Sequence, residues 1–243
     1  MNQEARYLAI ILAAGVGSRL DFDGPKSLFP IDNKPMIDYT FSSLSDAGSI
    51  DLLTVVGHKK DQVIKHIENR SSYLHQSPLL GTGHAAMKCI SQIEKYDNTF
   101  VFVADAPFVS RDYIYAMMKN HIKTNSDCTF LYSKFPIELP YGRLIFDASG
   151  KLKGLVEEHD ADLQIKKNNT YFTSQYLFKS KTLIKLLSLI EPDKKTGEYN
   201  LTETINIMLK EGSEICPLYI KEYWNLMGIN SIEDLSYIQG INE

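Results

Sequence analysis

The first half of the chain alternates short apolar runs with amphipathic helical patterns. Runs such as LAIIL and TFVFV are apolar at consecutive positions, which indicates strands buried on both faces, as in a parallel sheet that helices cover on each side. This alternation is typical of repeated β-α-β units. It predicts strands over residues 7–12, 52–56 and 99–103, and helices over residues 36–47, 60–69, 83–93 and 111–121.

The pattern changes after about residue 128. The segments CTFLYS, GRLIF, KLKGLVEE and YFTSQYLF follow one another with only turn residues between them, which indicates a mixed sheet. Helical patterns then cover residues 181–190 and 202–211, and a short helix is expected from about residue 231. We therefore predict a single α/β domain over residues 1–243. It combines a doubly wound, mostly parallel, Rossmann-like sheet, in about residues 1–125, with a mixed-sheet lobe in about residues 126–243.

Composition narrows the class of protein and of ligand. Of the 243 residues, 44% are hydrophobic and 23% are charged, which excludes a disordered or fibrous chain. The net charge of −4 gives no basic field, so we expect a small ligand and neither a nucleic-acid nor a membrane partner. Cys89, Cys128 and Cys216 are far apart and form no CxxC pair, so neither disulfides nor a zinc site is predicted. The N-terminus shows no signal-peptide pattern, and we expect a cytoplasmic location.

A glycine loop follows the first predicted strand, at the end where a doubly wound sheet binds its ligand. It reads AAGVGSR over residues 13–19, and Lys26 follows shortly after. Glycines let backbone N–H groups approach a phosphate, and Arg19 and Lys26 add charge-assisted contacts to a polyanion. An ordinary tight turn with two solvated cations is the alternative. The loop matches neither GxxxxGK[ST] nor GxGxxG, because Leu20 stands at the third glycine of the latter.

The glycine loop belongs to a longer series of motifs that continues along the chain. LAAGVGSRL followed by PKSLFPIDNKPMID resembles the first-strand signature of sugar-nucleotide pyrophosphorylases. The segment QSPLLGTGHAA, which begins at Gln76, is similar to the Q-x-x-x-x-GTGHA segment in the uridylyltransferase domain of the bacterial bifunctional N-acetylglucosamine-1-phosphate uridylyltransferase. The segments VADAP, YGR, GLVEEHDA, GEYNLTE and GIN resemble further motifs of that family, in the same order along the chain.

The resemblance implies a nucleotidyltransferase fold of the GT-A type, with a nucleotide site and a sugar-binding lobe. It implies nucleotide contacts from Leu12, Ala13, Ala14, Gly15, Gly17, Gln76, Gly81 and Thr82, and substrate contacts from Gly142, Glu157, Phe172, Thr173 and Thr202. In the family, the glutamine and the first glycine of GTG read uracil. A side-chain amide offers the donor and the acceptor that this base requires. Taken alone, Gln76 would be interpreted as a surface glutamine.

A magnesium site is implied by Asp105, at the end of a buried strand, and by Asn230 in the late GIN motif. Both side chains offer oxygen atoms of the kind that Mg²⁺ accepts, and this ion takes its other ligands from waters and phosphates. Taken alone, Asp105 also suits the cap of the following helix, and Asn230 suits a turn. His84 is expected to pack or to support a neighbour, because this chemistry needs no imidazole.

The implied reaction is attack by a phosphate oxygen of a sugar 1-phosphate on the α-phosphorus of UTP, with pyrophosphate as the leaving group. The attacking phosphate is already anionic near neutral pH, so positioning and charge neutralisation carry the catalysis. Lys26 would hold the transferring phosphate, Arg19 the leaving pyrophosphate, and Mg²⁺ would bind Asp105 and Asn230. We therefore expect a sugar-1-phosphate uridylyltransferase of the UDP-N-acetylglucosamine pyrophosphorylase type.

The chain departs from the family where the sugar would bind. The family places an asparagine of an I-N-T-G stretch against the N-acetyl group. Here the stretch reads YFTS, with Phe172 at the asparagine and Ser174 at the glycine. Asn200 replaces the second tyrosine of GEYY, and Glu203 replaces the aspartate of LTD. A site that loses a specific polar contact usually serves a changed substrate. The alternative is therefore a cytidylyltransferase, or another nucleotidyltransferase that acts on a non-amino-sugar phosphate.

Two further expectations concern the limits of the resemblance. A non-catalytic nucleotide sensor is disfavoured, because Arg19, Lys26 and Asp105 are all retained. The bifunctional relatives continue into a β-helix of hexapeptide repeats, which acetylates the amino sugar and trimerises the protein. This sequence ends at Glu243, so we expect neither acetyltransferase activity nor that mode of trimerisation. The pattern predicts no other oligomeric state.

Overall fold

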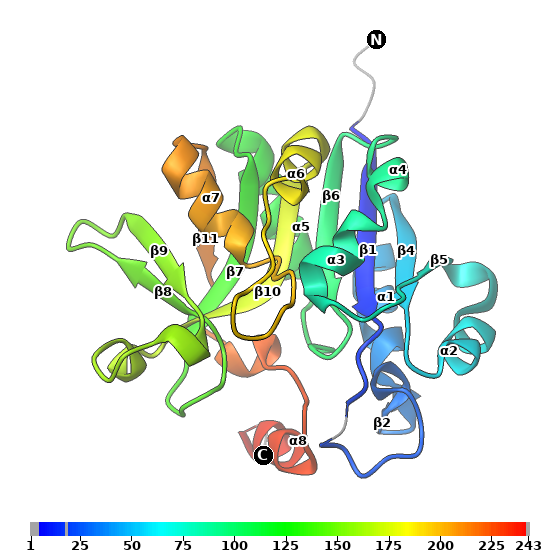
Figure 1. The fold of residues 1–243 in the computed structure, drawn as a ribbon. Helices are drawn as coiled ribbons and strands as arrows, with labels where there is room; N and C mark the ends of the chain where they lie inside the picture. The colour runs from blue at the N-terminus through cyan, green and yellow to red at the C-terminus, as the bar shows by residue number, and fades with distance from the viewer. Residues whose placement is uncertain (1–4, 18, 242–243) are drawn as a thin grey trace.

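A computed structural model describes residues 5–17 and 19–241 and has one large mixed sheet at its centre (Figure 1). The main path of this sheet runs in the order β11-β7-β10-β6-β1-β4-β5. Its strands are β1 (Tyr7–Ala13), β4 (Ile50–Val56), β5 (Ser72–His75), β6 (Asn98–Val103), β7 (Cys128–Lys134), β10 (Thr170–Lys179) and β11 (Ile215–Tyr219). Beside this path, β8 (Arg143–Phe146) pairs with β10 and with β9 (Leu152–Val156), while β2 (Pro30–Ile31) and β3 (Lys34–Pro35) form a separate ribbon.

Strands β5, β4, β1 and β6 form a parallel half, which confirms the predicted β-α-β order. Strand β1 lies between β4 and β6, with Tyr7 opposite Ile50 on one side and Asn98 on the other. It is therefore buried along almost its whole length. This position explains why its sequence is apolar at consecutive residues instead of alternating.

Strand β10 interrupts the parallel order, because it runs antiparallel to both of its neighbours, β6 and β7. Its pairing with β7 shifts between Phe172 and Tyr176. Within this bulge Ser174 has a φ of 61°, in the left-handed region that favours glycine. The sequence comparison placed Ser174 at a glycine of the related motif, and the backbone is consistent with that alignment.

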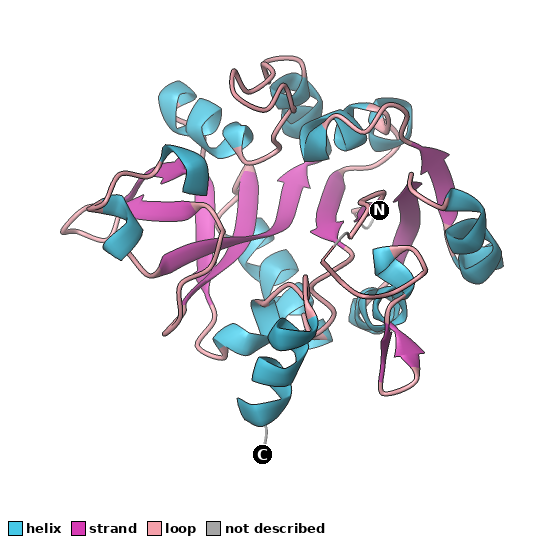
Figure 2. Ribbon diagram, turned by 60° about the horizontal axis from the view of Figure 1, so that its bottom comes forward, coloured by secondary structure: helices cyan, strands magenta, loops and turns pink. Residues whose placement is uncertain are grey.

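Helices cover both faces of the sheet (Figures 1 and 2). Apolar residues of α1 (Met36–Ala47), α2 (Lys60–Ile67), α5 (Arg111–Lys123) and α8 (Ile232–Ile241) join one core cluster. Those of α3 (Gly81–Met87), α4 (Ile90–Ile93), α6 (Ser180–Leu187) and α7 (Glu203–Glu211) join the other. This double covering confirms the predicted doubly wound α/β class.

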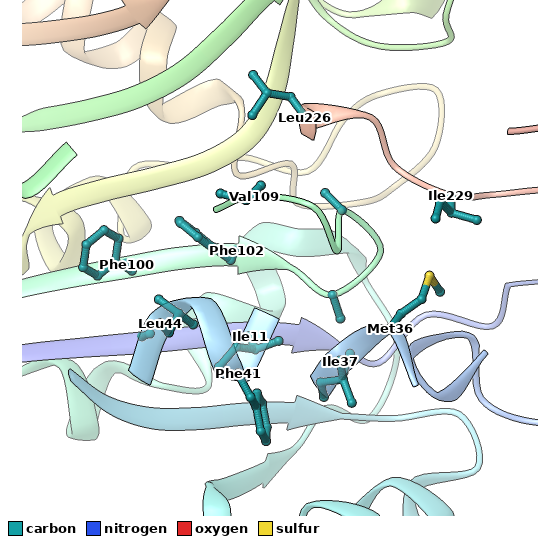
Figure 3. Packing of buried hydrophobic residues seen from close by; sticks show 14 of the residues in the cluster. Ile11, Met36, Ile37, Phe41, Leu44, Phe100, Phe102, Val109, Leu226 and Ile229 are labelled. Carbon is teal, nitrogen blue, oxygen red and sulfur yellow. The ribbon is translucent and has the colours of Figure 1, made fainter. Parts of the chain in front are cut away.

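The first cluster also anchors the C-terminal part of the chain. Figure 3 shows side chains of α1, such as Phe41 and Leu44, close to Ile11 of β1, with Leu226 and Ile229 in the same cluster. Both Leu226 and Ile229 are essentially inaccessible to solvent. Their burial fixes the segment that carries the neighbouring Asn230.

Three elements differ from the predicted pattern. The helix predicted over residues 83–93 begins at Gly81 and is divided in two, because the backbone tightens where Cys89 N donates to Ala86 O. Strand β5 was not predicted, because it is short and mostly exposed. Strand β11 was not predicted either, since Pro217 disfavours a strand, and the structure places it at the edge of the sheet. No helix in the described ranges is long and apolar enough to cross a membrane.

Candidate active site

Two adjoining cavities open where β1 and β6 end. The first has a volume of about 440 Å³ and is bordered by the glycine loop and the GTG segment. The second, of about 280 Å³, lies against the lobe built by β8, β9 and β10. The residues that line both cavities are Arg19, Thr82, Val103, Asp105, Asn200 and Asn230. Ligands in the two cavities would therefore meet along this shared wall.

The glycine loop forms one side of the first cavity. Of the predicted residues, Leu12, Ala13, Ala14, Gly15, Gly17 and Arg19 all line it, whereas Ser18 lies outside the described residues. Gly17 has a φ of 68°, and a Cβ atom there would lie 2.5 Å from Cβ of Lys26. Only glycine at this position lets the loop close over Lys26.

The GTG segment forms the opposite side of the first cavity, and Gln76, Gly81 and Thr82 all line it. Gly81 has a φ of 90°, and a Cβ atom there would lie 2.7 Å from the carbonyl oxygen of Tyr199. The hydroxyl oxygen of Thr82 accepts a hydrogen bond from Leu201 N at 3.0 Å. These contacts join the GTG and GEYNLTE segments, which are more than a hundred residues apart in sequence.

Three predicted residues meet where the two cavities adjoin. The Lys26 ammonium forms an ion pair with Asp105 and donates to the amide oxygen of Asn230 at 2.7 Å. Their places depend on neighbouring backbone contacts, because Ile229 N donates to the carbonyl oxygen of Asp105 at 2.8 Å. The structure thus brings the proposed phosphate ligand and the two proposed metal ligands to one point.

The structure also tests the alternative roles of these residues, a helix cap for Asp105 and a turn for Asn230. Asp105 does not cap α5, since Ser110 is the residue that accepts from the first turn, from Tyr113 N at 3.4 Å. Asn230 does precede a helix, and its amide nitrogen donates to Gly228 O at 3.3 Å. Its amide oxygen still faces Lys26, so this turn position is compatible with the proposed ligand role.

The site fits a hard divalent cation. One carboxylate oxygen and one amide oxygen converge on a point that already attracts the positive charge of Lys26. Two protein oxygens suffice for Mg²⁺, because this ion keeps several waters and takes phosphate oxygens as further ligands. Asp105 and Asn230 could therefore hold the metal.

The second cavity gathers the predicted substrate residues, namely Gly142, Glu157, Phe172, Thr173 and Thr202. The Thr202 hydroxyl donates to the Glu157 carboxylate, and burial raises the pKa of Glu157 above its usual value. The Thr173 hydroxyl donates to the carbonyl oxygen of Leu131 at 2.9 Å and so is partly used within the protein. Glu157 thus adds a second carboxylate to this cavity, beside Asp105.

Phe172 closes the second cavity mainly by packing. Its side chain is 2% exposed and contacts the Phe130 ring edge-on, with the centroids 5.0 Å apart. Its backbone N–H donates to the carbonyl oxygen of Gly142 at 2.9 Å. Phe172 therefore offers the cavity a small apolar surface and no hydrogen-bonding side-chain group.

Tyr141 was not predicted as a site residue, although it begins the YGR motif and lines the second cavity. Its hydroxyl accepts from Gly228 N at 3.0 Å and thus holds the segment that leads to Asn230. Burial, with the nearby Asp105 charge, raises the Tyr141 pKa well above its usual value, so the hydroxyl stays neutral. The YGR motif could have indicated Tyr141 from the sequence, whereas its contact with Gly228 is seen only in the structure.

Arg143, the last residue of the YGR motif, forms a buried ion pair that we expect to stabilise the fold. Its side chain is fully buried, pairs with Glu158 and lies 5.0 Å from the centroid of the Tyr171 ring. Replacing Glu158 by alanine leaves this buried cation undercompensated, and we expect unfolding to become easier by about 2–3 kcal/mol. Urea denaturation measures the change. The exposed pair of Lys185 and Glu211 provides the control, since Lys185→Ala should cost at most about 1 kcal/mol. Equal stability of Glu158→Ala and the wild type would contradict the prediction.

Known proteins resemble this chain along most of its length. The sequence model of the family described as "Nucleotidyl transferase" matches residues 8–236. The bifunctional protein GlmU of Staphylococcus carnosus (strain TM300) is 30% identical over 232 residues, which cover 95% of this chain and 51% of the relative. GlmU of Geobacillus sp. (strain WCH70) is 32% identical over 226 residues, with coverage of 93% and 49%. The chain thus spans about half the length of the curated relatives it matches.

A solved structure confirms the fold expectation. A UDP-glucose pyrophosphorylase in complex with UDP-glucose superposes with a TM-score of 0.77, and the alignment covers 98% of each chain. Its sequence is 20% identical to this one, so the similarity concerns the fold alone. The predicted GT-A-like architecture therefore rests on the sheet topology and on this superposition together.

Proposed function

This chain belongs to the nucleotidyl transferase family, and on that premise we propose that it transfers UMP from UTP to a sugar 1-phosphate, with release of pyrophosphate. The observation that carries the proposal is the place where the two cavities adjoin: Lys26, which lines the first cavity, contacts Asp105 and Asn230, which line both. A reaction that joins two bound anions needs positive charge at their junction. Lys26 and Arg19 supply this positive charge.

The first cavity is the proposed nucleotide site. The glycine loop lies on one side for the phosphates, and Gln76 and Gly81 lie on the other for the base. The resemblance of the segment that begins at Gln76 to the uracil-reading segment of the family supports a uracil nucleotide. The second cavity, with Glu157 and Thr202, is the proposed sugar site.

The proposed step forms one bond and breaks one. A phosphate oxygen of the sugar 1-phosphate bonds to the α-phosphorus of UTP, and the bond from that phosphorus to the β-bridging oxygen breaks. Pyrophosphate leaves with the bonding electron pair. Lys26 holds the transferring phosphate, and Arg19 holds the leaving group. Because the attacking phosphate is already anionic near neutral pH, no side chain needs to exchange a proton. Mg²⁺ held by Asp105 and Asn230 would neutralise charge on the phosphates.

A pyrophosphate-release screen tests the proposal. It crosses the four ribonucleoside triphosphates and dTTP with a panel of sugar 1-phosphates and alcohol phosphates. We expect the largest release with UTP and a sugar 1-phosphate, and none without a divalent cation. Tight UTP binding without release from any pair would instead indicate a nucleotide sensor. Release with CTP and an alcohol phosphate would favour the alternative cytidylyltransferase.

Phe172 predicts which sugar is disfavoured. Its ring offers no hydrogen bond to an acetamido group, and an unpaired buried amide costs about 1–3 kcal/mol. We expect N-acetylglucosamine 1-phosphate to be a poor substrate, with kcat/KM below roughly 10⁴ M⁻¹s⁻¹. We expect Phe172→Asn to raise its use about tenfold relative to the best substrate of the wild type.

The measurement is the ratio of kcat/KM for these two substrates in each variant. Because Phe172 also packs against Phe130, Phe172→Leu serves as the control that removes the ring without adding an amide. An unchanged ratio in Phe172→Asn would contradict the interpretation of this stretch as a change of specificity. Ordinary efficiency of the wild type with N-acetylglucosamine 1-phosphate would do the same.

A further inference from the structure

We propose that His84 sets the base preference of the first cavity, because it fixes Gln76 as a hydrogen-bond acceptor toward the bound base. The inference rests on the proposed function, in which this cavity holds the nucleotide. It assigns a specificity-determining role to a side chain that the reaction itself does not use. His84 would act through Gln76 and is therefore a positioning residue.

The Gln76 amide nitrogen is engaged on both sides. Nε2 donates to the carbonyl oxygen of Gly81 at 2.9 Å and lies 3.2 Å from Nδ1 of His84. An amide nitrogen has two hydrogens, so these two partners use both of them. Among the residues that the structure describes, no group donates to the amide oxygen of Gln76. The side chain is 4% exposed and lines the first cavity, so its oxygen is left for the base.

The direction of these hydrogen bonds is determined by the Gly81 carbonyl, which can only accept, so the atom beside it is the amide nitrogen of Gln76. An amide nitrogen cannot accept a hydrogen bond, so Nδ1 of His84 accepts from it. A neutral imidazole has one donor and one acceptor nitrogen, and its proton therefore lies on Nε2. Burial lowers the pKa of His84, which keeps the ring neutral near pH 7.

Reversal of the Gln76 amide is disfavoured twice. It would turn Oε1 toward the carbonyl oxygen of Gly81, and it would require a proton on Nδ1 of His84. In the neutral ring that proton would have to move from Nε2 to Nδ1. Buried acceptors that face each other without a hydrogen are costly.

The fixed orientation of the Gln76 amide, called the lock below, distinguishes bases by the hydrogen-bonding group at their N3 position. Uracil and thymine carry an N3–H donor, which the oxygen of Gln76 can accept. Cytosine carries an acceptor at N3, so it would face the same oxygen without a hydrogen between them. The lock therefore predicts selection against CTP, and it predicts no strong separation of UTP from dTTP by this pair of residues.

Equilibrium binding of UTP, dTTP and CTP by calorimetry tests the lock without any sugar substrate. In the wild type we expect UTP and dTTP to bind at least about tenfold more tightly than CTP. In His84→Phe the ratio of CTP to UTP dissociation constants should fall about tenfold or to near unity, since one of the two constraints is lost. His84→Asn, which can return an acceptor to this position, should retain more of the wild-type ratio than His84→Phe.

His75→Phe is the matched control, because His75 is exposed and directly precedes Gln76, and its ratio should equal that of the wild type. If His84→Phe fails to fold, His84→Ala gives the same readout without added bulk. A wild type that selects UTP and keeps its selectivity in both variants overturns the lock alone. A wild type that prefers CTP overturns both the lock and the proposed uracil specificity.

Discussion

Replacement of Asp105 by alanine is expected to lower turnover at ordinary Mg²⁺ by about 10²–10³-fold or more. Asp105 is the only carboxylate among the described residues that line both cavities, and it pairs with Lys26 there. A hard divalent cation left with one neutral amide ligand binds weakly. Initial rates of pyrophosphate release over a range of Mg²⁺ concentrations measure the effect.

The magnesium dependence distinguishes loss of a ligand from general damage. We expect part of the lost rate of Asp105→Ala to return at high Mg²⁺, because weak binding is offset by concentration. The surface pair of Asp23 and Lys59 supplies a matched control, since Asp23 is fully exposed and lies outside both cavities. Asp23→Ala should keep the wild-type rate. Full turnover of Asp105→Ala at ordinary Mg²⁺ would show that Asp105 holds no metal.

Replacement of Lys26 by alanine is expected to reduce kcat about 10²-fold or more, the scale on which a preorganised charge acts in a water-poor site. The Lys26 side chain is 14% exposed, and Gly17 lets the glycine loop close against it. It contacts both proposed metal ligands, so its ammonium lies at the place where the two bound anions would join. Steady-state rates with UTP and the best sugar 1-phosphate give the comparison.

The two losses should respond differently to magnesium. High Mg²⁺ should not restore Lys26→Ala, because the missing charge would act on the transferring phosphate and not on the metal. Lys59→Ala, which removes a lysine that pairs with the exposed Asp23 outside both cavities, should behave as the wild type does. A Lys26→Ala rate within about threefold of the wild-type rate would return Lys26 to the role of a solvated cation.

Much of the parallel half was predictable because its signals are local. The apolar runs at β1 and β6 and the amphipathic pattern of α1 report burial and period, and both depend on neighbouring residues. The antiparallel direction of β10 was not predictable, since a strand buried on both faces has the same pattern whichever way it runs. The edge strand β11 was not predicted, because its pairing with β7, and not the propensity of its residues, makes it a strand.

The site divides in the same way. By itself, the sequence located the segments that carry the proposed phosphate-binding glycines, the strand-end carboxylate and the glutamine proposed to read the base, because each belongs to a short motif of particular residue types. Only the tertiary structure decided that Lys26 meets Asn230, 204 residues later, since strand order and the anchoring of Ile229 bring them together. The same holds for the acceptor role of Gln76. The direction of a hydrogen bond depends on the partners that surround it in space, and sequence patterns do not record those partners.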